Sequence, residues 1–213
     1  ALDEVVERRA ALSVKRASDA ARPARTFFAR ASLPKGIVRN LRTPGHFDDA
    51  IDVLEARDVK DGRPLARFVD FACHPETLGD RAYLLTADFP GVVRAETERA
   101  RGGTTVFANG SLGGMITPDV DDSADVRERV AFFESMGRRI ADLANEAIAN
   151  APSVAIERVA HHRREIELRA DSALARYISR VGLIEPRRRG PTGGVVTEVG
   201  RVDLGPLSLV LIP

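Results

Sequence analysis

Two short segments of the sequence carry residue types that could do chemistry. His74 precedes Pro75, and Asn109, Gly110 and Ser111 stand together; each segment follows an apolar stretch typical of a strand. In open α/β sheets, ligands bind beyond the carboxyl ends of strands. A neutral imidazole held there can ligate zinc or act as a general base. A glycine-bearing loop can bring amide N–H groups close to an anion or a developing oxyanion. These two strand ends are therefore the predicted site.

Each segment also has a structural interpretation. His74 could close a strand end through a hydrogen bond to the backbone. The loop after Ala108 could be a flexible connection between a strand and a helix, because it lacks the lysine and Ser/Thr of a phosphate-binding P-loop. Ser111 could instead act as a nucleophile, which requires a base within hydrogen-bond reach.

Three further residue types bear on the chemistry. Asp88 lies just before a predicted helix over 90–101, where its carboxylate can cap the amides of the first turn or orient groups around a metal or substrate. His161 and His162 are adjacent strand residues, so they point to opposite faces and do not suit one metal ion. Cys73 has apolar neighbours, which favours a buried thiol over a nucleophile.

Hydrophobic periodicity predicts the elements that must position these residues. Helices are expected over 2–20, 90–101, 124–149 and 172–181, and strands over 25–31, 51–59, 64–73, 104–108, 154–169, 195–203 and 207–212. The strands 51–59 and 64–73 should form a hairpin, because Asp61-Gly62 is a tight-turn sequence. Interleaved strands and helices predict an α/β fold, a layered sheet of mixed parallel and antiparallel strands with helices packed on it.

Composition limits the partners. The chain has 213 residues and 44% hydrophobic content, enough for one α/β domain over 1–213. Lys plus Arg total 32 and Asp plus Glu total 31, so a net charge of +1 gives no field to attract nucleic acid. No apolar run approaches the roughly 18 residues of a transmembrane segment. The single cysteine excludes an internal disulfide.

The two ends of the sequence favour an excerpt of a longer protein. Helical periodicity begins at Leu2 with no capping residue before it, and the chain stops at Pro213, at the tip of an apolar strand that we expect to be buried.

Four motifs in order resemble the neutral/alkaline non-lysosomal ceramidase superfamily, and most closely its bacterial ceramidase-like branch. They are Phe71–Pro75, Thr77–Gly79, Leu85–Gly91 and Val106–Gly110. Their order and spacing agree with the family over about residues 24 to 120. The resemblance implies a zinc amidohydrolase in which two histidines, a glutamate and a tyrosine hold the metal.

The resemblance places one zinc ligand in this chain, His74, as the second zinc histidine. The first histidine would lie upstream of Ala1, the glutamate directly after Pro213, and the tyrosine further downstream. A catalytic zinc needs three protein ligands and an open position, so we expect the segment alone to be inactive. Gly110 stands where true ceramidases have a serine, with Ser111 next to it. We therefore expect a small-molecule or lipid amide substrate, without ceramide being specified.

The resulting hypothesis is part of a zinc-dependent amidohydrolase, in which metal-activated water attacks an amide carbonyl. His74 would ligate Zn²⁺, Asn109, Gly110 or Ser111 would contact the substrate or oxyanion, and Asp88 would orient the metal site. The family context implies lipid metabolism and a secreted or periplasmic bacterial protein. The alternative is a non-catalytic ceramidase-like module of the same fold without zinc.

Overall fold

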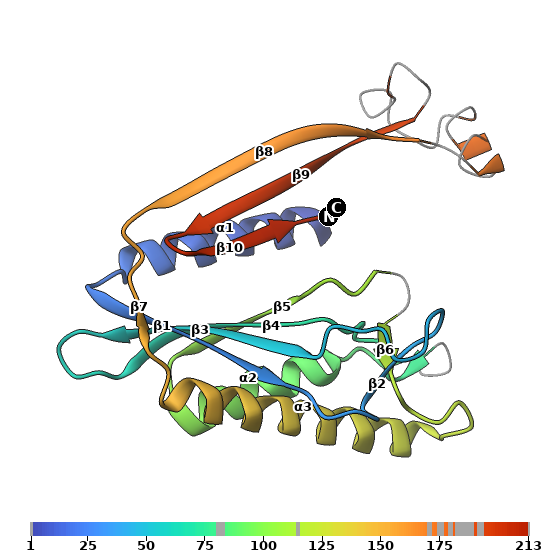
Figure 1. Ribbon diagram of the computed structural model, residues 1–213, viewed down its shortest axis with the longest axis horizontal. Coiled ribbons are helices and arrows are strands. Elements are labelled where there is room, and N and C mark those ends of the chain that lie inside the picture. Colours follow the sequence, from blue (N-terminus) through green and yellow to red (C-terminus); the bar gives the residue numbers. More distant parts are fainter. Residues whose placement is uncertain are drawn as a thin grey trace. The chain divides into compact units, whose positions relative to one another are not determined.

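The computed structural model describes residues 2–79, 84–113, 116–169, 172–173, 177–178, 181, 190 and 194–212. The chain divides into two compact units, residues 1–153 and 154–213. The first unit contains a mixed parallel and antiparallel sheet with helices packed against it, which confirms the predicted fold class (Figure 1). The prediction that residues 1–213 form one domain stays a prediction.

The central element of the first unit is a five-stranded sheet in the order β5-β4-β3-β1-β7. Its strands are β1 (Ala24–Ser32), β3 (Ala50–Asp58), β4 (Pro64–Phe71), β5 (Thr104–Asn109) and β7 (Ser153–Val154). The hairpin of β3 and β4 is confirmed, and these two strands pair antiparallel, as do β1 and β3. β4 and β5 pair in parallel, joined by the helix α2 (Asp88–Arg101). The carboxyl ends of β4 and β5 are therefore neighbours.

Helices α2 and α3 (Val126–Ala149) form the second layer, on one face of the sheet (Figure 1). The first turn of α3 is capped by Asp125, whose side chain accepts hydrogen bonds from the amides of Arg127 and Glu128 while the Glu128 carboxylate accepts from the amide of Asp125. Between the layers lies the core, whose buried residues are Leu33, Val38, Ile51, Val53, Val69, Phe71, Cys73, Leu78, Phe89, Val93, Ile116, Phe133, Met136, Ile140, Ala144 and Ile148.

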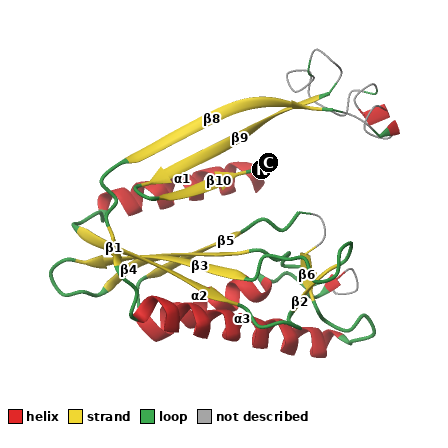
Figure 2. Cartoon of the chain, viewed as in Figure 1, coloured by secondary structure: helices red, strands yellow, loops and turns green. Residues whose placement is uncertain are grey.

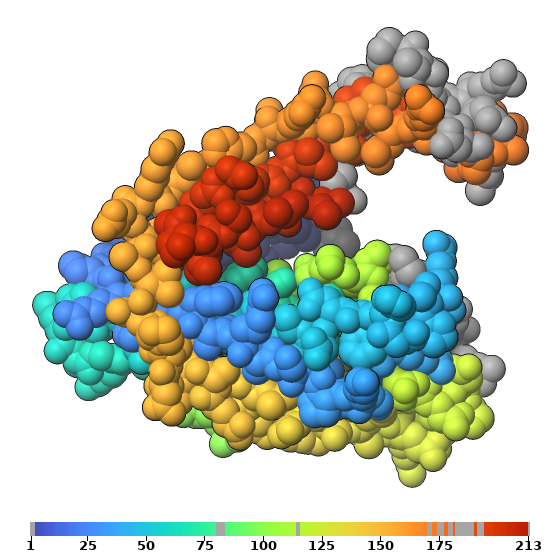
Figure 3. All heavy atoms as spheres, viewed as in Figure 1, coloured from blue at the N-terminus to red at the C-terminus, as the bar shows by residue number. Residues whose placement is uncertain are grey.

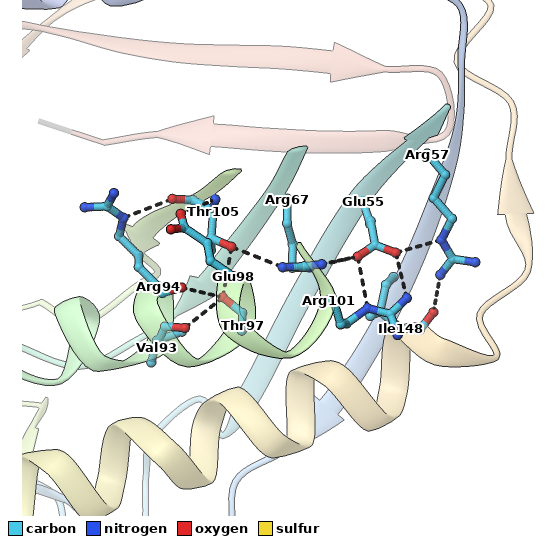
Figure 4. Close-up of polar contacts among 10 residues, drawn as sticks. All are labelled: Glu55, Arg57, Arg67, Val93, Arg94, Thr97, Glu98, Arg101, Thr105 and Ile148. Carbon is cyan, nitrogen blue, oxygen red and sulfur yellow. Dashed lines mark hydrogen bonds and ion pairs between the residues drawn. The ribbon is translucent and has the colours of Figure 1, made fainter. Parts of the chain in front are cut away.

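A buried ionic network also joins the sheet to the helices (Figure 4). Glu55 on β3 is fully buried and accepts hydrogen bonds from Arg57, Arg67 and Arg101. Burial alone would raise the pKa of Glu55, but the three guanidinium groups outweigh it and hold the pKa below its usual value. Arg67 also donates to the Thr105 hydroxyl on β5 at 3.1 Å. The network therefore links β3, β4, β5 and α2 through one carboxylate.

The sequence did not predict a second, small sheet in the first unit. β2 (Val38–Asn40) pairs antiparallel with β6 (Ile116–Pro118). The predicted irregular stretch after Pro34 thus contains a strand, too short for periodicity to identify. In the space-filling view, the light-blue atoms of the segment that contains β2 lie beside the gold atoms of α3 (Figure 3).

The N-terminal helix α1 (Leu2–Asp19) forms where the sequence predicted it. Its side chains from Asp3 to Asp19 are all exposed, including Val6 and Val14, at 58% and 71%. Within the part of the chain that the structure describes, every helix is too short or too polar to cross a bilayer.

The second unit is a three-stranded antiparallel sheet in the order β10-β9-β8 (Figure 2). Its strands are β8 (Val159–Leu168), β9 (Val195–Leu204) and β10 (Leu207–Leu211). β10 is an edge strand, and Val210, Leu211 and Ile212 are more than half exposed. The prediction of a buried closing strand is therefore wrong for the described residues. The helix predicted over 172–181 lies largely outside them.

Candidate functional site

The loop of residues 72–79, called the His74 loop below, begins where β4 ends. The segment that leads into β6 fixes both the backbone and the ring of His74. The His74 amide donates to the carbonyl oxygen of Ile116 at 3.0 Å. Its ring atom Nε2 lies 2.6 Å from the carbonyl oxygen of Gly113. Because a carbonyl only accepts, Nε2 must carry the proton in this contact, and in a neutral ring the lone pair is then on Nδ1. The structural interpretation of His74 as a strand-end residue bonded to backbone therefore applies, and this contact does not engage the lone pair of Nδ1.

The loop after β5 lies directly beside this histidine. β4 and β5 are in register with Phe71 opposite Asn109, and the Gly110 amide donates to the Phe71 carbonyl oxygen at 3.1 Å. That N–H is therefore already engaged and does not face an oxyanion. Asn109 and Ser111 are exposed, and their polar groups form no hydrogen bond to a side chain within the described residues. Of the three predicted residues, these two have donors available.

Asp88 holds the His74 loop against the start of α2. It is 4% exposed, and its carboxylate accepts from the amide and hydroxyl of Thr77 at 2.9 and 2.7 Å and from the amide of Phe89 at 2.7 Å. The helix begins at Asp88 itself, with φ at +51°, and not at Pro90 as predicted. The expected contact with a first-turn amide is present, and the bonds to Thr77 add a positioning role.

Sequence reasoning missed Arg129, which holds the same loop from α3. Its guanidinium donates to the carbonyl oxygen of Thr77 at 3.0 Å and to three carbonyl oxygens just before the helix, those of Asp121, Asp122 and Ala124. Thr77, which is bonded to both Asp88 and Arg129, is fully buried. The loop that presents His74 is thus anchored to the starts of both α2 and α3.

Asp70 on β4 is a second residue that sequence reasoning missed. A Cβ atom added to Gly110 would lie 3.1 Å from each carboxylate oxygen of Asp70, so this carboxyl group lies directly against the predicted loop. Burial, and then the nearby charges of Asp52 and Asp48, raise the pKa of Asp70 to about 6. Within the described part of the chain its carboxylate has no hydrogen-bond or ion-pair partner. The alternation of burial along β4 could have placed Asp70 on a face, but not beside Gly110.

Two other residues considered in the sequence have surroundings of their own. Cys73 is buried, which confirms the predicted buried thiol, and burial, together with the charges of Asp88 and Glu76, raises the pKa of that thiol. His162 contacts Asp203 at 3.3 Å in the second unit. No three His, Cys, Asp or Glu side chains among the described residues are arranged to hold a metal ion. The described residues therefore do not form a complete zinc site.

Comparison with known proteins gives a structural likeness and no sequence match. No protein-family model matches the sequence, and the search of curated proteins finds no match. The neutral ceramidase from Pseudomonas aeruginosa superposes with a TM-score of 0.70 at 15% identity, covering 93% of this chain and 41% of that chain. A structure of ceramidase complexed with C2 gives a TM-score of 0.69 at 15% identity, covering 92% and 42%.

These values support a ceramidase-like fold for this chain. At 15% identity the likeness concerns the fold alone. The chain spans about two-fifths of the length of the structures it matches.

Proposed function

We propose that this chain is part of the catalytic domain of a zinc-dependent amide hydrolase, with His74 as one metal ligand. The carrying observation is the orientation of the imidazole. Metal-binding histidines commonly donate their second ring N–H to a backbone carbonyl or carboxylate, which fixes the tautomer and the ring. The contact between Nε2 and the Gly113 carbonyl oxygen is of this kind, and it supports Nδ1 as the proposed ligand atom.

The remaining ligands would come from polypeptide outside the described residues, as the ceramidase resemblance implies. A bound zinc ion acts as a Lewis acid toward water and the amide carbonyl. This chain's own contribution is to hold the ligand and the substrate. Asp88 and Arg129 fix the His74 loop through Thr77. The amide and hydroxyl of Ser111 and the side chain of Asn109 are the donors for a substrate carbonyl.

The substrate class we propose is a lipid amide. The P. aeruginosa protein with this fold is described as a neutral ceramidase, and a ceramide is an N-acyl amide. Gly110 replaces the serine expected in that loop by the family resemblance, so the acyl and head groups accepted by this protein can differ from those of a ceramide.

The test is zinc stoichiometry and amide hydrolysis in the full-length protein that carries this chain. We expect His74→Ala to lose bound zinc by elemental analysis and to lose hydrolysis of a fluorescent N-acyl sphingosine and of a short-chain N-acyl amide. His162→Ala, an exposed histidine of the second unit, is the matched control and should retain both. Unchanged zinc content in His74→Ala would refute the assignment, and a zinc-free wild type would favour a non-catalytic module.

A serine hydrolase is less well supported. A nucleophilic Ser111 needs a base within hydrogen-bond reach, and the described residues place no imidazole or carboxylate on its hydroxyl. The His74 ring is bonded to Gly113 instead. If a serine-directed phosphonate labels the protein and Ser111→Ala abolishes the labelling, the serine hydrolase becomes the better supported function.

A further inference from the structure

The face of the sheet that lies away from α2 and α3 carries a row of ionisable side chains across three strands. Register pairs Arg30 on β1 with Asp52 on β3, and Asp52 with Asp70 on β4. The row ends at Ala108 on β5, with Gly110 two residues further along the same face. The row therefore leads to the loop of the candidate site.

The two carboxylates in this row are in different states. Asp52 receives two hydrogen bonds from the Arg30 guanidinium, each of 2.6 Å, and forms an ion pair with it. Asp70 is half-buried and has no such partner among the described residues. Its carboxylate oxygens lie against the Gly110 backbone, where a side chain on residue 110 would displace them. Asp70 is thus a half-buried carboxyl group that lies against the loop and has no counter-ion among the described residues.

Other carboxylates near these strand ends are less suited to this role. Asp88 is committed to three hydrogen bonds, and Asp48 accepts from the amide of Ala50. Glu76, in the His74 loop, is exposed to water. Groups that exchange protons in catalysis are typically ionisable side chains whose surroundings bring their pKa toward the working pH, as the surroundings of Asp70 do.

We propose that Asp70 is the acid–base group of this site, an assignment that rests on the proposed amide hydrolase function. Its carboxylate takes one proton from the attacking water as the water oxygen bonds to the carbonyl carbon. The C–N bond then breaks, the nitrogen leaves with the electron pair, and Asp70 returns the proton to that nitrogen. One amide and one water become one carboxylic acid and one amine, with Asp70 regenerated.

Within the described residues of the first unit, the charged groups that face Asp70 are Asp52, with its partner Arg30, and Asp48. The neighbouring positions on the β5 side are the uncharged Ala108 and Gly110. Burial, and then the charges of Asp52 and Asp48, disfavour the ionised form of Asp70 and so raise its pKa. A general base must be ionised, so kcat/KM should rise with pH through about 6.

The experiment is the pH profile of kcat/KM for the full-length protein with a fluorescent N-acyl amide. We expect Asp70→Asn to lower kcat by about 10²- to 10⁴-fold and to remove the acidic limb. Asp48→Asn keeps the acceptor for Ala50 but removes one charge, so it should move the limb to lower pH. Glu76→Gln is the matched control and should keep both rate and limb.

The outcomes separate this proposal from the proposed function. An active wild type whose limb survives in Asp70→Asn, or vanishes in Glu76→Gln, overturns the role of Asp70 and leaves the hydrolase assignment standing. A wild type that hydrolyses no amide at any pH overturns both. Circular dichroism of Asp70→Asn distinguishes loss of the limb from loss of the fold.

Discussion

Replacing Asp88 by alanine tests whether this carboxylate fixes the loop that presents His74. The change leaves three buried donors without their acceptor, namely the Thr77 amide, the Thr77 hydroxyl and the Phe89 amide. Hydrogen bonds to a charged group contribute about 1.5 to 3 kcal/mol each, so a simple sum is about 5 to 9 kcal/mol. Bonds that share one carboxylate are not additive, and water can reach part of an opened loop. We therefore expect a loss of about 3 to 5 kcal/mol.

The positive φ of Asp88 allows the backbone contribution to be separated. Alanine at φ +51° is disfavoured relative to glycine by about 1 kcal/mol, so Asp88→Gly should be less destabilised than Asp88→Ala by about that amount. Thr77→Val removes the hydroxyl alone and should cost about 1 to 2 kcal/mol. Glu146→Ala on the exposed face of α3 is the control and should stay within about 0.5 kcal/mol of wild type.

Denaturant unfolding measures the total effect, and hydrogen exchange of peptides that cover residues 74–79 measures the local one. Faster exchange confined to this loop and the start of α2 is the expected pattern for Asp88→Ala. A loss below about 1 kcal/mol together with unchanged exchange in this loop would refute the claim that Asp88 anchors it.

Three other substitutions test the packing and electrostatics. Arg67→Met should cost about 3 to 5 kcal/mol in denaturant unfolding, because it breaks a buried ion pair with Glu55, and adding Glu55→Leu should recover part of that loss. Gly137→Ala should cost about 1 to 3 kcal/mol, because a Cβ there would lie 2.9 Å from the Phe89 carbonyl oxygen; an unchanged melting temperature would contradict this. The pKa of Asp70 is raised from 3.8 to about 6 in the folded protein. Its contribution to the free energy of unfolding is therefore fully present below pH 3.8 and is lost as the pH rises through 6. The stability of Asp70→Asn relative to wild type should therefore increase between about pH 4 and pH 7. The pKa shift sets an upper limit of about 3 kcal/mol, and solvent screening of this half-buried group reduces the expected gain to about 1 kcal/mol. A stability difference that does not change with pH would contradict the raised pKa of Asp70.

The sequence predicts an element well where its hydrophobic periodicity extends over many residues. The α3 stripe and the Asp125 cap are local signals, and the helix forms within two residues of the predicted bounds of 124–149. The short β2 and β6 ladder carries three residues on each side, too few for a period-2 pattern to stand out. The last strand was expected to be buried because it is apolar, but its position at a sheet edge leaves Val210 exposed. Apolar composition alone does not determine which strand is central.

Some residues of the candidate site could be predicted from adjacent sequence, and others depend on contacts between distant segments. Pro75 indicates the end of β4 from adjacent sequence, so His74 could be placed at a strand end before any pairing was known. Asp70 needs the register of β4 with both β3 and β5, and a slip of one residue would turn its carboxyl to the helix face. Arg129 reaches Thr77 across 52 positions of sequence, a contact that only the packing of α3 creates. Contacts of this kind cannot be identified from a single sequence. The acid–base proposal for Asp70 therefore required the strand register of the folded sheet, which places its carboxyl group beside Gly110.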